Sequence, residues 1–316
     1  MDTRKTYTLS IVLPVLNEAR LLPEALAEIG ECARRSGADY EIIVVDDGST
    51  DWTWEIIGAL AEESPEIRGI RLSRNFGKES AIVSGIESAS GDAVIVMDAD
   101  LQHPPALIPE MVAKWREGTA DIVEAVKVHR GREPLSSSLG AKFFYWLLRH
   151  LAGIDLDNAS DFKLLDRKVV DAHNRFPESS RFFQGIVFWL GFRKVQIPFS
   201  VPERADGRSR RSTWKLIRLA VNASTAYSSF PLHFITLMGA VTFFVSMVLV
   251  IQTLSMKFSG HAVSGFTTVI LLLLFIGSAL MLSLGIIGLY ISRIYEEVKR
   301  RPKFIIEDTI NIARKK

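Results

Sequence analysis

The sequence has a single cysteine, Cys32, in 316 residues. One cysteine excludes an internal disulfide and a cysteine-based metal cluster, and it fits a reducing compartment. No Gly-x-Gly-x-x-Gly follows the first apolar run, and no Gly-x-x-x-x-Gly-Lys-Ser occurs, which disfavours a dinucleotide-binding enzyme and a P-loop nucleotidase. The N-terminus lacks a long apolar region ahead of a small-residue cleavage site. We therefore expect no secretory signal peptide and a cytoplasmic location for the first 230 residues.

Charge is scarce in two long stretches, 232–256 and 266–291, which contain no Asp, Glu or Lys. Each is long enough to cross a hydrocarbon core of about 30 Å at a rise of about 1.5 Å per residue. A pair of buried helices in a large core is the alternative, but core helices rarely run past about 20 residues without a charge. We expect a two-helix transmembrane hairpin over 231–292.

Basic residues flank the expected hairpin on both sides, whereas its connecting loop, 257–265, is short and nearly uncharged. By the positive-inside rule, both ends of the hairpin are cytoplasmic. The stretch 212–230 has the pattern of a juxtamembrane amphipathic helix lying in the membrane interface. The remaining segment, 293–316, is expected to be a basic cytoplasmic tail.

The first 211 residues mix charged and apolar residues as a soluble domain does. Apolar runs alternate with helix-length amphipathic stretches, which indicates an α/β domain with a mainly parallel sheet covered by helices. The runs 42–45 and 94–97 are apolar at every position, as central parallel strands are when both faces are covered. Ligands bind beyond the carboxyl ends of such strands.

Both of these runs end in acidic residues: Asp46 and Asp47 follow the first, and Asp98 and Asp100 follow the second. Two carboxylates two residues apart can share a hard divalent cation, Mg²⁺ or Mn²⁺, whose other ligands are phosphate oxygens. Such a metal would neutralise a diphosphate leaving group. A solvated Asp-x-Asp turn is the alternative, and Asp47 has the alternative role of a turn residue.

Six blocks of sequence carry a resemblance to a known family. They are Leu13-Pro14-Val15-Leu16-Asn17-Glu18, Val45-Asp46-Asp47-Gly48-Ser49, Ser73-Arg74-Asn75-Phe76-Gly77-Lys78, Asp98-Ala99-Asp100-Leu101-Gln102-His103-Pro104-Pro105, Ser160-Asp161-Phe162-Lys163-Leu164-Leu165 and Glu203-Arg204-Ala205-Asp206-Gly207-Arg208-Ser209. In these blocks the chain resembles the family 2 inverting glycosyltransferases of GT-A fold, in the branch that makes polyprenyl-phosphate sugars. Bacterial bactoprenol glucosyltransferases are most similar, and dolichol-phosphate mannose synthase is more distant.

The resemblance implies roles for the matching residues. Asp98 and Asp100 would hold Mn²⁺ or Mg²⁺, with Asp100 counted among the catalytic residues, and Asp161 would be the catalytic base or the group that orients the acceptor. The nucleotide-sugar pocket would contain Pro14, Leu16, Glu18, Val45, Asp47, Asp98, Ala99 and Gln102. From the residues alone, Asp161 has the alternative role of a helix cap. A surface-loop position for His103 is favoured over a place beside the metal.

The implied acceptor, undecaprenyl phosphate, is anionic and needs cationic partners. Guanidinium groups match the geometry of phosphate oxygens. The candidates for this phosphate clamp are Arg130, Arg132, Arg204 and Arg210. Contact with anionic lipid headgroups alone is the alternative for the arginines from 204 to 218, and among these Arg204 is favoured as a phosphate ligand.

The sequence therefore predicts transfer of one hexose from a nucleotide sugar to undecaprenyl phosphate, with inversion, at the cytoplasmic face of a bacterial inner membrane. The product would be a sugar donor for cell-envelope glycosylation. Resemblance alone favours glucose from UDP-glucose over galactose, N-acetylhexosamine, mannose and 4-amino-4-deoxyarabinose donors. Membrane lipids are further expected partners and nucleic acid is not, and similar enzymes suggest a homo-oligomer, a tetramer.

Two other functions compete with this one. A processive polysaccharide synthase shares the fold and the Asp-x-Asp, but its Gln-x-x-Arg-Trp element is missing, since Gln184 is followed by Gly-Ile-Val-Phe-Trp. A non-catalytic membrane subunit that binds nucleotide sugars is the second. The presence of Asp161 argues against it, because a pure binding protein has no need of that residue.

Overall fold

The structure, a computed structural model, describes residues 7–127, 160–176, 183–199, 230–259 and 265–312. The chain divides into two units. The first comprises Met1–Arg132, Leu156–Arg208 and Arg301–Lys316, and the second comprises Glu133–Asp155 and Ser209–Arg300. The first unit contains the sheet, and the second contains two long helices.

The first unit is built on one mixed sheet with the strand order β7-β5-β6-β4-β1-β2-β3-β8. Its strands are β1 (Thr8–Val15), β2 (Asp39–Asp46), β3 (Ile67–Leu72), β4 (Ala93–Val96), β5 (Ile122–Lys127), β6 (Lys163–Asp166), β7 (Lys194–Phe199) and β8 (Ile306–Ile310). Strands β4, β1, β2 and β3 are parallel neighbours, whereas β6 runs antiparallel to both β4 and β5. The mainly parallel α/β sheet predicted from the sequence is therefore present.

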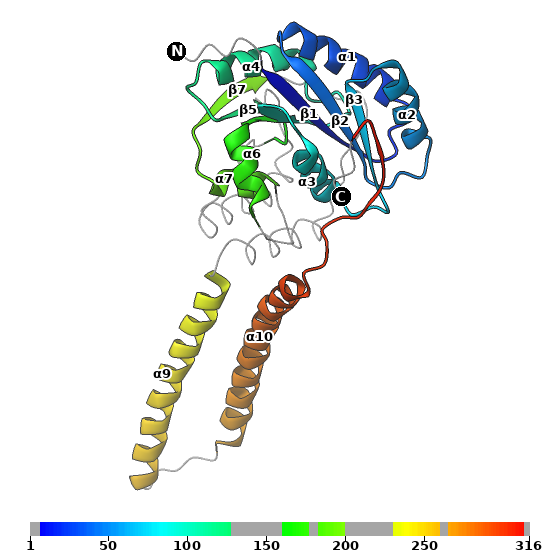
Figure 1. Cartoon of the computed structure of the whole chain (residues 1–316). Coiled ribbons are helices and arrows are strands. Elements are labelled where there is room, and N and C mark those ends of the chain that lie inside the picture. The colour runs from blue at the N-terminus through cyan, green and yellow to red at the C-terminus, as the bar shows by residue number, and fades with distance from the viewer. Residues whose placement is uncertain (1–6, 128–159, 177–182, 200–229, 260–264, 313–316) are drawn as a thin grey trace, which may run out of the picture. The chain divides into compact units, whose positions relative to one another are not determined.

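Helices cover both faces of this sheet (Figure 1). One face packs against α1 (Leu22–Arg35), α2 (Thr53–Glu63) and α4 (Ile108–Arg116), and a short 3-10 turn, Pro105–Leu107, precedes α4. The other face packs against α3 (Lys78–Ser88), α6 (Arg167–Asn174) and α7 (Phe183–Trp189). Because both faces are covered, the central strands are apolar at successive positions rather than alternating with polar residues.

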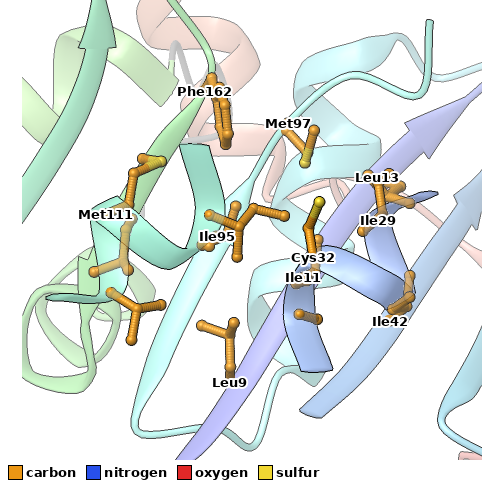
Figure 2. Close-up of a cluster of buried hydrophobic side chains, with 14 of the residues drawn as sticks. Leu9, Ile11, Leu13, Ile29, Cys32, Ile42, Ile95, Met97, Met111 and Phe162 are labelled. Carbon is orange, nitrogen blue, oxygen red and sulfur yellow. The ribbon is translucent and has the colours of Figure 1, made fainter. Parts of the chain in front are cut away.

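Two apolar layers follow from the alternation of side chains along each strand. Leu9, Ile11 and Leu13 of β1 lie in the layer under α1, together with Cys32, whereas Val12 lies in the layer under α3 (Figure 2). Cys32 is thus a small buried core residue. Helix α3 approaches β1 closely at Gly85, where an added Cβ would lie 2.2 Å from Cγ1 of Val12. Only glycine fits that contact, which fixes the position of α3 over the strand ends.

Strand β8 was not expected from the sequence, which indicated only a basic tail over 293–316. It pairs antiparallel with β3 and forms an edge of the sheet. Ile310 packs on the α1 and α2 side, and the side-chain amide of Asn311 donates hydrogen bonds to the carbonyls of Ala61 and Ile67 at 3.2 and 3.0 Å. The C-terminal segment therefore belongs in part to the same unit as the sheet.

The second unit contains α9 (Phe230–Phe258) and α10 (Phe266–Lys299). Both segments expected to span a membrane are helical. Residues Phe275–Lys299 of α10 are long and apolar enough to cross a membrane by length and composition, whereas the apolar part of α9, Ile235–Leu249, is shorter. Among the described residues this criterion identifies one candidate spanning helix, so both spans of the expected hairpin stay predictions.

Candidate active site

A pocket of about 250 Å³ lies at the carboxyl ends of β1, β2 and β4. This is the edge of a parallel sheet at which ligands bind. Its described lining consists of Pro14, Val15, Leu16, Glu18, Asp47, Lys78, Asp98, Ala99 and Asp100. The chain segments that follow three neighbouring strands, together with the start of α3, therefore form one concave site.

Most of the residues expected to bind a nucleotide sugar lie in this lining. Two do not. Val45 is fully buried in the apolar layer under α3, because its side chain points to the face of β2 that α3 covers. Gln102 follows the acidic turn, and its backbone N–H donates to a carboxylate oxygen of Asp100 at 3.0 Å. The roles of all these residues in binding stay predictions.

Asp47 is held by the backbone at the start of α3. Its two carboxylate oxygens accept hydrogen bonds from the N–H groups of Phe76 at 2.7 Å and of Gly77 at 2.9 Å. Burial raises the pKa of Asp47, and these two bonds oppose the rise. Gly77 has a φ of 98°, a backbone conformation that favours glycine. Asp47 thus fixes where α3 begins and where the next residue, Lys78, points.

The loop after β1 is tied to the loop after β2. Asn17, in a left-handed conformation with φ 56°, donates its N–H to Oγ of Ser49 and accepts the N–H of Thr50 on its side chain, each at 2.9 Å. This places Glu18 at the pocket beside the other acids. Burial, followed by the charges of Asp100, Asp51 and Asp98, raises the pKa of Glu18. The pocket therefore has a negative potential that favours a cation.

Lys78 joins two acidic residues that are far apart in the sequence. Its ammonium lies 2.6 Å from Oδ1 of Asp98 and 2.6 Å from Oδ2 of Asp161. The other oxygen of Asp161 accepts a hydrogen bond from Nε2 of Gln184 at 2.7 Å. Burial alone would raise the pKa of Asp161, but Lys78 and Gln184 outweigh it and hold that pKa below its ordinary value. Asp161 is therefore an ionised, fully engaged carboxylate beside the pocket.

The segment around Asp161 is anchored by hydrogen bonds to β5 and from Lys163. The Ser160 hydroxyl donates to the carbonyl of Ala125 in β5 at 2.7 Å, and Lys163 donates to the carbonyl of Ser160 at 2.5 Å. Strand β6, not a helix, follows at Lys163, and the cap of the next helix, α6, is Asp166, whose side chain accepts the N–H of Lys168. The alternative role of Asp161 as a helix cap is therefore wrong.

Apolar neighbours fix the backbone of the acidic residues. Met97 and Phe162, which adjoin Asp98 and Asp161 in sequence, are both fully buried in the layer shown in Figure 2. His103 is not a surface-loop histidine: its ring packs on Phe162, with centroids 5.5 Å apart, and its Nδ1 is 4.0 Å from a carboxylate oxygen of Asp98. Burial lowers the pKa of His103, against the opposing charges of Asp98 and Asp100.

The side chains present fit a divalent cation only in part. Within the described residues no group of three or more His, Cys, Asp or Glu side chains gathers as ligands. Asp98 and Asp100 offer two carboxylates at the pocket, beside the carboxylates of Glu18 and Asp47. Hard oxygen ligands of this kind suit Mg²⁺ or Mn²⁺ when a bound phosphate supplies further oxygens. The donor set thus fits a metal that binds together with a phosphate-bearing ligand.

Several expected site residues lie outside the described residues. These are the acceptor candidates Arg130, Arg132, Arg204 and Arg210 and the expected amphipathic stretch 212–230, apart from Phe230, where α9 begins. Conversely, four residues near the site had no role predicted from the sequence: Lys78, Glu79, Lys163 and Gln184. Lys78 follows Gly77, and Lys163 lies two residues after Asp161, both inside blocks that carry the family resemblance, and this proximity was the available signal.

Comparison with known proteins identifies the family. The model of glycosyl transferase family 2 matches residues 10–173, which contain the pocket lining, Asp161, most of β1 and the strands β2 to β6. The chain belongs to glycosyl transferase family 2. The match ends before α7 and the two long helices. Those parts can be compared only with relatives that align over nearly the full chain.

Two relatives resemble this family 2 member over nearly the full chain. An uncharacterized glycosyltransferase of Synechocystis sp. is 39% identical and covers 96% of this chain and 96% of the relative. A prophage-derived bactoprenol glucosyl transferase of Shigella flexneri is 36% identical and covers 95% of this chain and 97% of the relative. Both alignments are long enough to include the second unit of the fold.

The GT-A-like fold is shared with a solved structure. Glucosyl-3-phosphoglycerate synthase from Mycobacterium tuberculosis, crystallised with Mn²⁺, UDP-glucose and glycerol 3-phosphate, is 24% identical with a TM-score of 0.52. The match covers 70% of this chain and 80% of that chain. At this level of identity the likeness shows the fold.

Glu79, beside Lys78, gives a pH-dependent stability that can be measured. Burial raises its pKa to about 7, against the hydrogen bond its carboxylate accepts from the N–H of Phe183 at 2.8 Å. The ordinary value is 4.5, so the folded state binds this proton more tightly than the unfolded state. The resulting stabilisation is complete below the unfolded value and is lost as the pH rises through about 7.

We expect Glu79→Gln to raise the free energy of unfolding at pH 8 by about 1–3 kcal/mol and to leave it unchanged near pH 4.5. The amide keeps an oxygen for the Phe183 N–H but removes the buried charge. The measurement is thermal unfolding of the full-length protein in detergent between pH 4.5 and pH 8, with the exposed Glu62→Gln on α2 as the control. An unchanged pH slope in Glu79→Gln contradicts the prediction.

Proposed function

We propose that this chain is a metal-dependent, membrane-anchored hexosyltransferase that moves glucose from UDP-glucose to undecaprenyl phosphate with inversion at the anomeric carbon. The product would be a sugar donor for cell-envelope glycosylation. The observation that carries the proposal is the similarity of nearly the entire chain to a bactoprenol glucosyl transferase of Shigella flexneri, at 36% identity. A similarity limited to the catalytic fold would not include α9 and α10, whereas this alignment covers 95% of the chain.

The pocket supports a nucleotide-sugar donor. Pro14, Leu16 and Glu18 would border the nucleotide, and the diphosphate would lie against the turn that carries Asp98 and Asp100. A divalent cation held by those two carboxylates would neutralise the departing diphosphate. The solved protein with the same fold was crystallised with Mn²⁺ and UDP-glucose. The choice of glucose rests on the names of the relatives, and other hexose donors fit the same chemistry.

Asp161 would orient the acceptor phosphate for attack on the anomeric carbon. A polyprenyl phosphate is itself an anionic nucleophile. Asp161 would therefore orient the acceptor rather than remove a proton from it. Lys78 and Gln184 hold this carboxylate on both oxygens. The proposed cationic partners of the acceptor phosphate are Arg130, Arg132, Arg204 and Arg210.

The membrane part would bring the enzyme to its lipid acceptor. We propose a catalytic domain over 1–211, an interfacial helix over 212–230 and a two-helix hairpin over 231–292, with both termini cytoplasmic. The long α9 and α10 and the spanning candidate Phe275–Lys299 support this arrangement. We further propose a homo-oligomer, a tetramer. A monomer in mild detergent at high protein concentration would contradict the oligomer.

The test is transfer of label from UDP-glucose, UDP-galactose, UDP-N-acetylglucosamine, GDP-mannose and UDP-4-amino-4-deoxyarabinose to undecaprenyl phosphate by the purified full-length protein. Reactions contain Mn²⁺, Mg²⁺ or EDTA. We expect a chloroform-extractable product from one donor, lost in EDTA and in Asp98→Ala. Retained configuration at the anomeric carbon contradicts inversion. Absence of product from every donor, with folded protein, favours the non-catalytic binding subunit.

A further inference from the structure

Lys78 occupies an unusual position for a lysine in a pocket expected to bind a metal. Its ammonium lies 2.6 Å from Oδ1 of Asp98, one of the two carboxylates assigned to the metal, and 2.6 Å from Oδ2 of Asp161. One oxygen of Asp98 is therefore already paired with a cation before any ligand arrives.

The position of this ammonium is built into the fold. Asp47 holds the backbone of Gly77, the residue before Lys78, and the close contact of Gly85 with β1 fixes the rest of α3. The far end of the bridge is also fixed, because Gln184 binds the second oxygen of Asp161. The ammonium of Lys78 thus lies between two anchored carboxylates.

The charges around Lys78 are unequal. In the described lining of the pocket four side chains are acidic, Glu18, Asp47, Asp98 and Asp100, and Lys78 is the basic one. A divalent cation at Asp98 would lie next to a fixed positive charge unless the ammonium moved. A bound diphosphate changes this balance, since its oxygens can accept both the metal and the ammonium.

Resting on the metal site of the proposed function, we propose that Lys78 is a positioning residue that makes metal binding depend on the nucleotide. Its ammonium pairs with Asp98 and Asp161 in the free enzyme and excludes a divalent cation from Asp98. When a nucleotide diphosphate binds, its oxygens take up the displaced ammonium and supply ligands to the metal. The cation therefore enters with the nucleotide sugar, and not before it.

The test measures Mn²⁺ affinity of the full-length protein without nucleotide, by electron paramagnetic resonance of free Mn²⁺ and by calorimetry. We expect Lys78→Met to bind Mn²⁺ about tenfold more tightly than the wild type, because the competing charge is gone. Lys78→Arg keeps the charge and is expected to match the wild type. Equal or weaker Mn²⁺ binding in Lys78→Met overturns the proposal.

A second measurement repeats the titration with UDP present. The wild type is expected to gain about tenfold or more in Mn²⁺ affinity from UDP, and Lys78→Met to gain less, because it has no ammonium to hand to the diphosphate. An equal gain in both proteins also overturns the proposal. Lys78→Gln, which is uncharged but polar, repeats the Lys78→Met arm, and circular dichroism checks that each variant is folded.

Failure of the proposed function gives a different pattern. If Asp98→Asn leaves Mn²⁺ binding unchanged with UDP present, the assigned metal site is wrong, whatever the Lys78 variants do. If Asp98→Asn removes Mn²⁺ binding while the Lys78 variants behave as the wild type, the metal site stands and the competition by Lys78 is refuted. Neither readout depends on which sugar is transferred.

Discussion

Asp161→Asn is expected to lower kcat for sugar transfer about 10²- to 10⁴-fold, with little change in the affinity for UDP. The substitution keeps the size of the side chain. One atom becomes an NH₂ group, which can face Gln184 if that amide turns over, while the remaining oxygen faces Lys78. We therefore expect the variant to fold, but to lose the negative charge that we propose orients the acceptor and that pairs with Lys78.

The measurement combines steady-state rates at saturating donor with calorimetry of UDP binding. Asp171→Asn is the matched control, because Asp171 is an exposed carboxylate on α6 whose nearest cationic partner is Arg167 at 4.0 Å. The control should retain wild-type activity. An Asp161→Asn enzyme with more than about a tenth of the wild-type kcat would contradict a direct role in the reaction.

The central sheet could be predicted from the sequence because buried parallel strands leave a strong pattern. Residues 42–45 and 94–97 are apolar throughout, and the structure buries Ile43, Val44 and Val96 completely within β2 and β4. The acidic residues at the ends of these strands could be placed for the same reason, since the carboxyl ends of parallel strands meet at one edge of a sheet. Asp98 and Asp47 indeed line one pocket.

Strand β8 could not be predicted in this way. Residues 306–310 are short and include Glu307 and Asp308, a composition typical of an exposed tail. Their pairing with β3 depends on partners more than 200 positions earlier in the chain, such as Ala61 and Ile67, to whose carbonyls Asn311 donates. The residues adjacent to β8 in the sequence do not indicate which distant strand it pairs with.

The same limit applies to the site residues that were missed. A lysine at the start of a helix is normally a solvated surface residue, and nothing in the block around Gly77 shows that Lys78 reaches Asp98 and Asp161. His103 was placed on the surface because two prolines follow it. Phe162, which packs against its ring, lies just before β6, far along the chain. Contacts between segments distant in sequence decide both cases.

A buried network of charged side chains lies next to the segment that carries Asp161, so the stability of the fold and the position of Asp161 depend on the same residues. Lys163 and Glu124, on neighbouring strands β6 and β5, are both almost completely buried and form an ion pair. Lys194 of β7 and Gln196 contact the other oxygen of Glu124, at 2.9 and 3.2 Å. Lys163 also donates to the carbonyl of Ser160, so the network ends one residue from Asp161.

We expect Lys163→Met to lower the free energy of unfolding by about 3–5 kcal/mol at pH 8, because it leaves Glu124 charged and buried with only Lys194 to balance it. Thermal unfolding of the full-length protein would show a fall in Tm of roughly 10 °C. The loss should shrink at pH 5, since burial raises the pKa of Glu124 once Lys163 no longer opposes it, and the neutral acid is then tolerated. An equal loss at both pH values contradicts this account.

Two further variants separate stability from positioning. Lys168→Met removes a lysine that is half exposed and paired with Asp121, and it should cost less than about 1 kcal/mol. Glu124→Leu with Lys163→Met replaces the buried pair by apolar side chains and should recover most of the lost stability. Neither Lys163→Met nor the double variant has the hydrogen bond to the Ser160 carbonyl, so we expect a lowered kcat in both, while the Tm recovers in the double variant. Recovery of both would mean that Lys163 acts only on stability and that the segment holding Asp161 is anchored by the Ser160 hydroxyl and Phe162 alone.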